Sequence, residues 1–386
     1  MRALRDRDFI ATILGHFSID FLNSQVSLIL AVLAVPLALT NAQIGLVGMA
    51  YTFANSLTQP LFGWWADRFG SRRLAIGGPL WMGCLFAVAL ISPGYLPLVL
   101  MVVAALGSAA FHPQGTGHAT EAGERFIGMG ATTTALFFMA GQGGYAIGPI
   151  VGGQVLDRLG LTGVLVVCAI PIVGGLVQWA YFHPVPALDS PTPQRDSGSA
   201  PNRLRKMGTL AIVAFVLAVF LRSWAQFGII YYVPRFLAEN SMPSSFYGYV
   251  LSVFMLATTV GGVLGGALAD RVGEVPVLFL SLVLGALPTG AFPLTGGVTL
   301  FLVTTAAGLF LGAGHTLIVV IAQRLVPGKR ATASGLALGF MFASGGLGVF
   351  FSGLVADHVG LAAMLEGQGL LVLASAGAIL AWRALR

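Results

Sequence analysis

Four ionisable side chains stand deep inside long apolar stretches of the sequence: Asp20, His112, Arg222 and His315. Placing such a group at the centre of a membrane helix costs about 2.5–3.5 kcal/mol on insertion scales, so each needs a reason to be there. A carboxyl group and imidazoles can exchange protons, whereas an arginine stays charged and offers a fork of donors to a carboxylate or phosphonate. The four residues therefore indicate proton exchange and anion binding in apolar surroundings.

Asp20 is the candidate proton carrier. A carboxyl group removed from water takes up a proton more readily, and a nearby cation reverses this, so an arriving or departing partner can switch its protonation. His16 lies one helical turn away on the same face and can share the proton. His112 is a second candidate for proton exchange and also a candidate substrate contact, because Pro113 after it removes a helical hydrogen bond and opens the backbone of a cavity wall. The alternative for all three is structural: a static hydrogen bond between helices, or packing at a kink.

Arg222 is the candidate contact for an anionic substrate. Its alternative is a permanent structural pair with Asp20, since a buried charge needs a partner in either case. His315 is a further substrate candidate, although the small residues around it also favour close helix packing. Other side chains could add hydrogen bonds or an aromatic wall but more often serve as scaffold. They are Asn23, Gln114, Gln142, Gln226, Tyr231, Tyr232 and Trp224.

The composition requires a membrane. Of 386 residues, 56% are hydrophobic and only 9% are charged, against about 25% charged in soluble domains. This excludes an ordinary soluble enzyme. A spanning helix needs about 20 apolar residues. Breaks at Gly, Pro and charge clusters predict twelve spans, at residues 9–38, 43–65, 74–92, 96–118, 126–155, 161–183, 208–237, 245–268, 275–294, 298–323, 331–356 and 361–382.

The distribution of basic residues predicts the topology. With a cytoplasmic N-terminus, seventeen of the 20 Lys and Arg residues lie inside, and only Arg158 and Arg235 lie outside. This strong inside excess places both termini in the cytoplasm. The net charge of +6 follows from the topology and indicates no nucleic-acid partner. The long hydrophilic stretch is rich in Pro and Ser, so we expect six-helix bundles at 1–183 and 208–386, joined by a cytoplasmic linker at 184–207.

Two glycine and aspartate motifs occur twice. The segment from Gly63 to Gly70 recurs from Gly266 to Gly273, 203 residues later, and the segment from Gly153 to Gly160 recurs from Gly353 to Gly360, 200 residues later. Two homologous six-helix halves, with a substrate site between them, describe a secondary transporter. Asp20 and Arg222 are 202 residues apart, which puts them at equivalent positions in the two halves.

The segment GWWADRFGSRR (63–73) resembles the cytoplasmic signature between helices two and three of the major facilitator superfamily. The segment GYAIGPIVGG (144–153) is similar to the helix-five motif of its proton-coupled exporters. The resemblance covers the whole chain. Further segments resemble the fosmidomycin-resistance branch of bacterial exporters: 16–20, 111–113, 323–328, 345–348 and 356–358. The resemblance implies an all-α membrane protein of twelve transmembrane helices in two pseudo-symmetric bundles, whose cavity-lining helices carry the four ionisable residues.

The same resemblance implies a cytoplasmic latch, in which a carboxylate caps a facing helix and pairs with arginine in the outward-open state. Its residues are Gly63, Asp67, Arg68, Gly70, Arg72 and Arg73, with Asp270 and Arg271 in the second copy. That copy has Glu274 and no arginine after Gly273, so we expect it to lack the full basic clamp. The charges could alternatively serve topology alone. The stripe Gly144, Gly148, Gly152 with Pro149 is expected to pack helices across the seam between the halves.

These features predict proton-coupled export of a small anionic or amphiphilic molecule, by alternating access in the bacterial cytoplasmic membrane. The expected partners are the substrate, protons and the lipid bilayer, with the chain acting as a monomer, and the proton gradient replaces any cofactor. Cys84 and Cys168 show no metal-ligand spacing, so no metal is expected. One alternative is proton-coupled uptake of an organic anion. A remote one is an intramembrane enzyme with His112 or His315 as base, for which the spacing shows no nucleophile and hence no catalytic residue.

Overall fold

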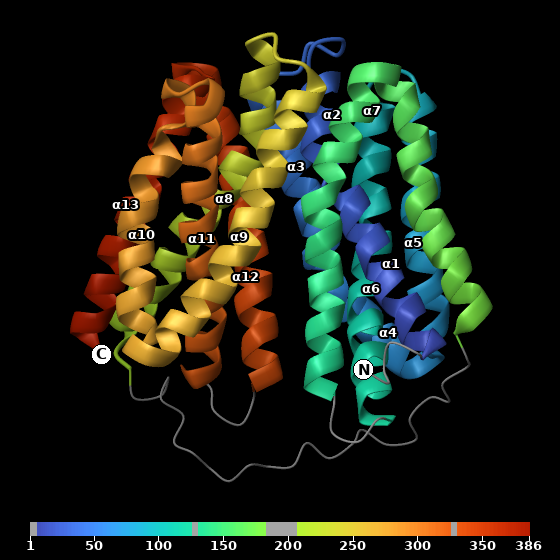
Figure 1. Cartoon of the computed structure of the whole chain (residues 1–386), viewed down its shortest axis with the longest axis horizontal. Helices are drawn as coiled ribbons and strands as arrows, with labels where there is room; N and C mark the ends of the chain where they lie inside the picture. Colours follow the sequence, from blue (N-terminus) through green and yellow to red (C-terminus); the bar gives the residue numbers. More distant parts are fainter. Residues whose placement is uncertain (1–5, 126–129, 183–206, 326–329) are drawn as a thin grey trace. The chain divides into compact units, whose positions relative to one another are not determined.

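A computed structural model describes residues 6–125, 130–182, 207–325 and 330–386. All regular secondary structure in these ranges is helical, and the helices are long (Figure 1). The expected linker at 184–207 lies outside the described residues except for Met207. The chain divides into two compact units. Unit 1 contains residues 1–39, 50–190 and 237–252, and unit 2 contains residues 40–49, 191–236 and 253–386.

Unit 1 is built around a buried first helix. The helix α1 begins where the Asp6 side chain accepts a hydrogen bond from the backbone N–H of Phe9 at 3.0 Å, a typical N-cap. It packs against α7 and α6, and α5 packs against the same two helices (Figure 1). The helices of this unit are α1 (Arg7–Asn23), α2 (Val26–Leu33), the end of α3 (Asn41–Ser56), α4 (Gln59–Phe69), α5 (Arg72–Ile91), α6 (Leu96–Arg125), α7 (Gly130–Tyr181) and the start of α9 (Ser244–Val272).

Unit 2 repeats this plan with the second half of the chain. Here α10 packs against α11 and α13, and α12 packs against α11 and α13. The fully buried side chains of Trp382 and Tyr232 lie in its interior. The helices of this unit are the start of α3, α8 (Thr209–Glu239), the rest of α9, α10 (Glu274–Gly290), the short 3₁₀ helix η3 (Phe292–Leu294), α11 (Gly297–Leu325), α12 (Arg330–Val359) and α13 (Leu361–Leu385).

The repeated motifs end in the same backbone turn. Gly70, Gly160, Gly273 and Gly360 have φ angles of 86°, 66°, 93° and 87°, a left-handed region that residues with a side chain rarely adopt. Gly160 therefore breaks the 52-residue segment α7 into two helices at the boundary expected from the sequence. The four turns support the internal repeat that the motifs indicate.

Two expected spans are interrupted in the structure. Between α1 and α2, the side chains of Ser24 and Gln25 both donate to the carbonyl oxygen of Phe21, at 2.7 and 2.9 Å, in competition with the helical backbone bonds. Between α3 and α4, the Thr58 hydroxyl donates to the Ala54 carbonyl at 2.6 Å. Pro60 lies at the start of α4 and has no N–H to offer. Each break replaces a continuous helix by two shorter ones.

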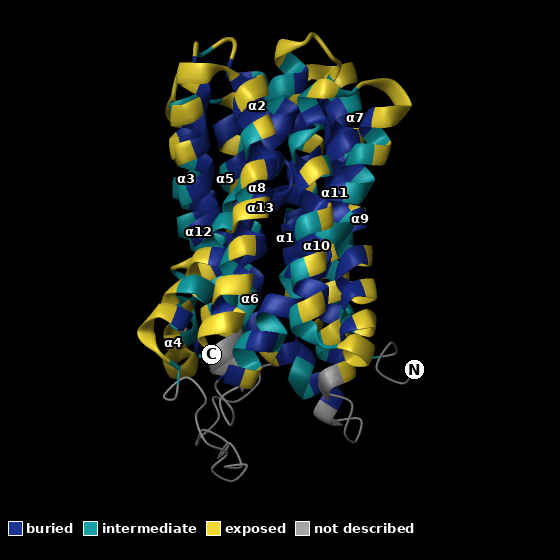
Figure 2. Ribbon diagram, turned by 90° about the vertical axis from the view of Figure 1, so that its left-hand side faces the viewer, coloured by how far each residue is buried: buried dark blue, intermediate teal, exposed yellow. Residues whose placement is uncertain are grey.

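Within the described ranges, nine helical segments are long and apolar enough to cross a membrane, and α1 with α2 counts as one of them (Arg7–Leu33). One of them, Thr132–Tyr181, holds two expected spans on either side of Gly160. The other expected spans fall on the 17-residue α10 and on α3 with α4. Exposed leucines such as Leu287 and Leu370 recur along α10 and α13 between buried residues (Figure 2). Such apolar outer faces suit contact with lipid.

Candidate functional site

Asp20 lies at the centre of a buried cluster in unit 1. Its Oδ2 atom is 3.2 Å from His16 Nε2, and its Oδ1 atom is 3.4 Å from His112 Nε2. The helix α1 supplies Asp20 and His16, and α6 supplies His112 just before Pro113. The structure therefore brings together the three residues that the sequence analysis assigned to proton exchange.

Backbone carbonyl groups fix which ring nitrogen of each histidine carries hydrogen. His16 Nδ1 lies 2.7 Å from the carbonyl oxygen of Phe137, and His112 Nδ1 lies 2.7 Å from that of Ser108. Because a carbonyl oxygen can only accept, both Nδ1 atoms must donate. In a neutral ring the lone pair is then on Nε2, the atom that faces Asp20. A lone pair against a carboxylate is repulsive, and a proton or another cation between these atoms would relieve that repulsion.

A short polar network supports the cluster. Asn23 Nδ2 donates to Asp20 Oδ1 at 3.0 Å and to the Ser108 hydroxyl at 2.9 Å. Tyr51 donates its hydroxyl hydrogen to Asn23 Oδ1 at 2.5 Å. Asn23, expected as a substrate contact, thus has its amide hydrogens engaged beside the carboxylate. Tyr51 and Ser108 were not expected at the site, because neither residue type signals a buried network on its own.

The cluster is closely packed. The His16 ring stacks on Phe137, with ring centroids 3.9 Å apart. A Cβ atom at Gly141 would lie 2.5 Å from His16 Nε2 and 2.6 Å from Asp20 Oδ2, so only glycine fits there. Three side chains of the cluster each offer one ligand atom: His16, Asp20 and His112. These atoms lie within 4.8 Å of one another, a spacing at which they could hold a metal ion. The expected absence of a metal stays a prediction.

Arg222 on α8 is fully buried in unit 2. Its Nη2 atom donates to Gln226 Oε1 at 2.5 Å and to the Leu311 carbonyl oxygen at 2.8 Å. Its Nε and Nη1 atoms have no hydrogen-bond partner in the described part of the chain, nor does a carboxylate there form an ion pair with it. A buried charge without a counter-charge is costly, so the guanidinium is suited to an anion.

Two other expected substrate residues lie close to Arg222. Gln226 is its direct partner. His315, half-buried on α11, follows Gly314, where an added Cβ would lie 3.1 Å from Arg222 Nε. Other candidates have structural partners: Trp224 donates to Ser352 at 2.8 Å, Gln114 to the Phe62 carbonyl at 3.2 Å, and Tyr232 to the Asn41 and Val349 carbonyls. Tyr231 is buried and Gln142 is exposed.

In this structure the expected latch residues have local partners or are exposed, and they do not form the carboxylate–arginine pair of the latch among the described residues. Arg72 donates to the carbonyl oxygens of Phe182 and Trp179, at 3.0 and 3.3 Å, and so caps the end of α7. Arg68 stacks over the Trp64 ring, 4.7 Å from its centroid. Asp67, and likewise Asp270 and Arg271 in the second copy, are exposed and form no ion pair among the residues that the structure describes. Neither Gly63 nor Gly70 is crowded.

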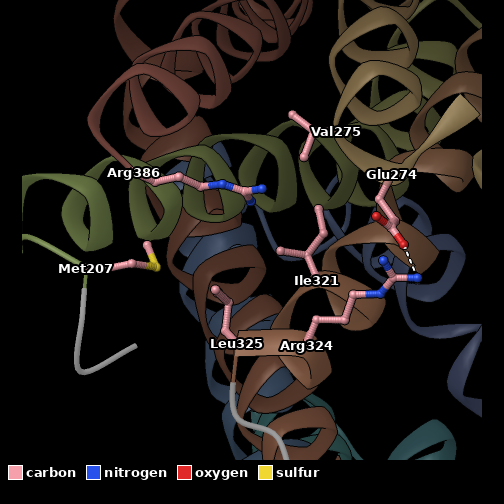
Figure 3. Close-up of a pocket in the computed structure, with 7 residues that line it drawn as sticks. All are labelled: Met207, Glu274, Val275, Ile321, Arg324, Leu325 and Arg386. Carbon is pink, nitrogen blue, oxygen red and sulfur yellow. Dashed lines mark ion pairs between the residues drawn. The ribbon is translucent and has the colours of Figure 1, made fainter. Parts of the chain in front are cut away.

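The second copy of the motif has a different partner. Glu274, at the start of α10, forms an ion pair with Arg324 at the end of α11, at 2.5 Å. Both residues border a cavity of about 250 Å³, which Met207, Val275, Ile321, Leu325 and Arg386 complete (Figure 3). The residues expected to contact substrate lie elsewhere. The second copy of the motif thus has Glu274 where the first copy has basic residues. In place of a basic clamp, it forms the ion pair of Glu274 with Arg324 within unit 2.

The glycine stripe of α7 corrects one expectation. A Cβ at Gly144, Gly148 or Gly152 would collide with Phe17, Ser24 or Gln25, which lie on α1 and the turn after it. The stripe therefore packs α7 against the first helix inside unit 1, whereas the sequence analysis placed it at the seam between the halves. The contact is this close because the glycines lack side chains. The Pro149 carbonyl oxygen, by contrast, faces Gly248 of α9, which belongs to the second half of the chain, so the expectation is corrected for the three glycines only.

Known proteins resemble the chain along its whole length. The Escherichia coli (strain K12) protein named "Fosmidomycin resistance protein" is 26% identical, over 90% of this chain and 86% of its own. An MFS-type transporter of Bacillus subtilis (strain 168), YfnC, is 27% identical, over 90% and 85%. Among solved structures, a point mutant of the nucleoside transporter NupG matches with a TM-score of 0.81 at 16% identity, covering 98% of this chain and 100% of its own. A bacterial homologue of the human lysosomal transporter Spinster matches with a TM-score of 0.80 at 15% identity, covering 98% and 96%.

The family model described as Major Facilitator Superfamily matches residues 10–242 and 215–386. Together the two matches extend over nearly the whole chain. The two solved transporter structures named above share the fold of this chain. The expectation of a multi-pass membrane transporter, and not an enzyme, is thereby confirmed. The chain belongs to the Major Facilitator Superfamily of transporters and resembles its fosmidomycin-resistance branch.

Proposed function

We propose that the protein exports a small anionic molecule in exchange for protons, by alternating access across a bacterial cytoplasmic membrane. The observation that carries this proposal is the state of Arg222. It is fully buried, it has two nitrogen atoms without a partner, and the described residues offer it no carboxylate. A site built in this way favours a ligand that brings a negative charge.

The cluster around Asp20 supports proton coupling. Its two histidines present Nε2 atoms to one carboxylate while their Nδ1 atoms are committed to carbonyl oxygens. A proton between these atoms relieves the repulsion, and imidazole exchanges protons near neutral pH. A proton moving inward releases about 2.3 kcal/mol per 100 mV and about 1.4 kcal/mol per pH unit. This free energy suffices to drive a substrate gradient of about a hundredfold or more.

The direction of transport rests on the relatives. The Escherichia coli relative is named for resistance to fosmidomycin, and resistance fits removal of a compound from the cell. The excess of basic residues on one side supports cytoplasmic termini and a cytoplasmic linker between halves at 1–183 and 208–386. The protein acts as a monomer, and the proton gradient is its only energy source. The exposed Asp67 and its neighbours form the latch in the outward-open state.

Transport in proteoliposomes tests the proposal. We expect the purified protein to move fosmidomycin against its gradient when a pH gradient is imposed, and to stop when an uncoupler collapses that gradient. A thermal-shift screen of phosphonates, organic acids and antibiotics extends the search for substrates. Flux of substrate in the same direction as the protons would instead establish uptake by symport. Binding of all anions by Arg222→Ala as tightly as by the wild type would refute the anion site.

A further inference from the structure

The hydrogen bonds of Arg222 leave no complete fork for an anion. Its Nη2 atom carries two hydrogens, and both are used, one by Gln226 Oε1 and one by the Leu311 carbonyl. Among the described residues, Nε and Nη1 have no hydrogen-bond acceptor. An oxyanion that binds through two oxygens needs two adjacent nitrogens of the guanidinium. Both adjacent pairs, Nε with Nη2 and Nη1 with Nη2, include the occupied atom.

One of the two present partners must therefore leave when such an anion binds. The Leu311 carbonyl belongs to the middle of α11, and moving it would disrupt that helix. Gln226 is a side chain one turn along α8 from Arg222, and its rotatable bonds allow it to turn away. Its neutral amide oxygen fills one acceptor position without compensating the buried charge. Gln226 is thus the partner that can be displaced.

We propose that Gln226 is an internal placeholder at the anion site, displaced when a carboxylate or phosphonate binds Arg222 through two oxygens. This inference rests on the proposed function, because it deepens the role of Arg222 as the substrate contact. The glycine at position 314 agrees with it, since an added Cβ would press on Nε at 3.1 Å. The absence of a side chain there keeps α11 from pressing on Nε.

The residue type at position 226 then determines how tightly Arg222 can bind a substrate anion. A glutamate there would offer Arg222 two charged oxygens from within the protein. It would neutralise the guanidinium permanently and leave no driving force for a substrate anion. A methionine of similar length would offer neither a comparable acceptor nor a charge. Gln226→Glu and Gln226→Met therefore separate the placeholder from a residue that contacts substrate.

The experiment measures binding of fosmidomycin, phenylphosphonate and benzoate to the purified full-length protein, by calorimetry and thermal shift. We expect Gln226→Glu to melt at a higher temperature without ligand and to bind each anion at least about tenfold more weakly. Gln226→Met should bind at least as tightly as the wild type, because no placeholder has to leave. Gln368→Glu, at another buried glutamine of unit 2, controls for burying a carboxylate and should keep its response to anions.

The outcomes distinguish this inference from the proposed function. If Arg222→Ala loses binding but Gln226→Glu binds like the wild type, the anion site stands and the placeholder is rejected. Loss of binding in Gln226→Met, which does not depend on Gln226→Glu folding, would show that Gln226 contacts the substrate directly and would also reject the placeholder. If the wild type binds none of the three anions, both proposals fail together. Preference for the phosphonates or for benzoate identifies the oxyanion class.

Discussion

Asp357, on α12, caps the N-terminus of α3 at Asn41. Its two carboxylate oxygens accept hydrogen bonds from the backbone N–H groups of Asn41 and Ala42, at 2.8 and 2.9 Å. The repeat gives Asp157 a related position, where it accepts a hydrogen bond from the Ser245 hydroxyl at the start of α9, at 2.8 Å. A carboxylate at a helix N-terminus both fills donor positions and opposes the helix dipole.

Asp357→Asn should therefore lower the free energy of unfolding. The loss of a helix cap costs about 0.5–2 kcal/mol, and the exposed position favours the lower end of this range. A thermal or denaturant melt of the purified protein measures it. Asp270→Asn is the matched control, because that exposed carboxylate forms no ion pair in the described ranges. Equal stability of both variants would argue against the cap.

Asp20→Asn should abolish gradient-driven accumulation while sparing substrate binding and exchange. The asparagine imitates the protonated carboxyl group and cannot release a proton, so the coupling step is lost. Proton flux and substrate flux in proteoliposomes measure this, with binding as the internal control. Wild-type accumulation by the variant would contradict a proton-carrying role for Asp20.

A fixed structural pair of Asp20 with Arg222 predicts a different pattern. Each single substitution would then strand a buried charge, and the double variant Asp20→Asn with Arg222→Gln would recover stability. We expect no such recovery, because Asp20 already has histidine partners and Arg222 has Gln226. Melting temperatures of the three variants decide between the two readings.

Gly141→Ala should disrupt the proton cluster. Its new methyl group would come within 2.5 Å of His16 Nε2 and 2.6 Å of Asp20 Oδ2, so the imidazole ring and the carboxylate must both move away from it. Coupled transport should fall about tenfold or more, as expected when cluster geometry is lost. Gly143→Ala is the matched control on the same helix, because its methyl group would meet only Phe17, at 3.8 Å. Equal transport by the two variants would be evidence against this packing.

Glu274→Gln should destabilise unit 2 slightly and in a salt-dependent way. The ion pair with Arg324 is partly exposed, with 63% of the arginine side chain accessible, so its contribution is about 1 kcal/mol or less. Salt screens such a pair, and the difference in melting temperature from the wild type should shrink between about 0.05 M and about 1 M NaCl. A loss that is independent of salt would point to packing around the cavity and not to charge.

The sequence predicts the apolar helices well, because a membrane requires long hydrophobic segments, and these can be recognised directly in the amino-acid sequence. The repeated motif draws attention to Gly160 and Gly360 in the sequence, but their left-handed φ angles come from the structure. The grouping of His16 with Asp20 follows from helical spacing. That His112 from another helix joins them follows only from how the helices pack.

Other parts of the site depend on neighbours that the sequence does not show. In the sequence, Gly141 cannot be distinguished from many other glycines. Its importance comes from the cluster packed against it in the structure. Arg72 was expected to serve a latch, but its reach to the Phe182 carbonyl depends on where α7 ends. The glycine stripe was recognised as a packing surface, whereas its partner helix required the structure.

The four glycines that end the repeated motifs with left-handed φ angles also matter beyond this chain. A residue with a side chain would cost about 1–3 kcal/mol at each of these turns, whereas exposed leucines on the outer faces can be exchanged for other apolar residues with little effect. Sequence drift should therefore erase the outer faces long before it erases Gly70, Gly160, Gly273 and Gly360. At the 15–16% identity seen with the solved structures, these positions offer landmarks for aligning remote relatives. Each marks the start of a corresponding helix in the repeat.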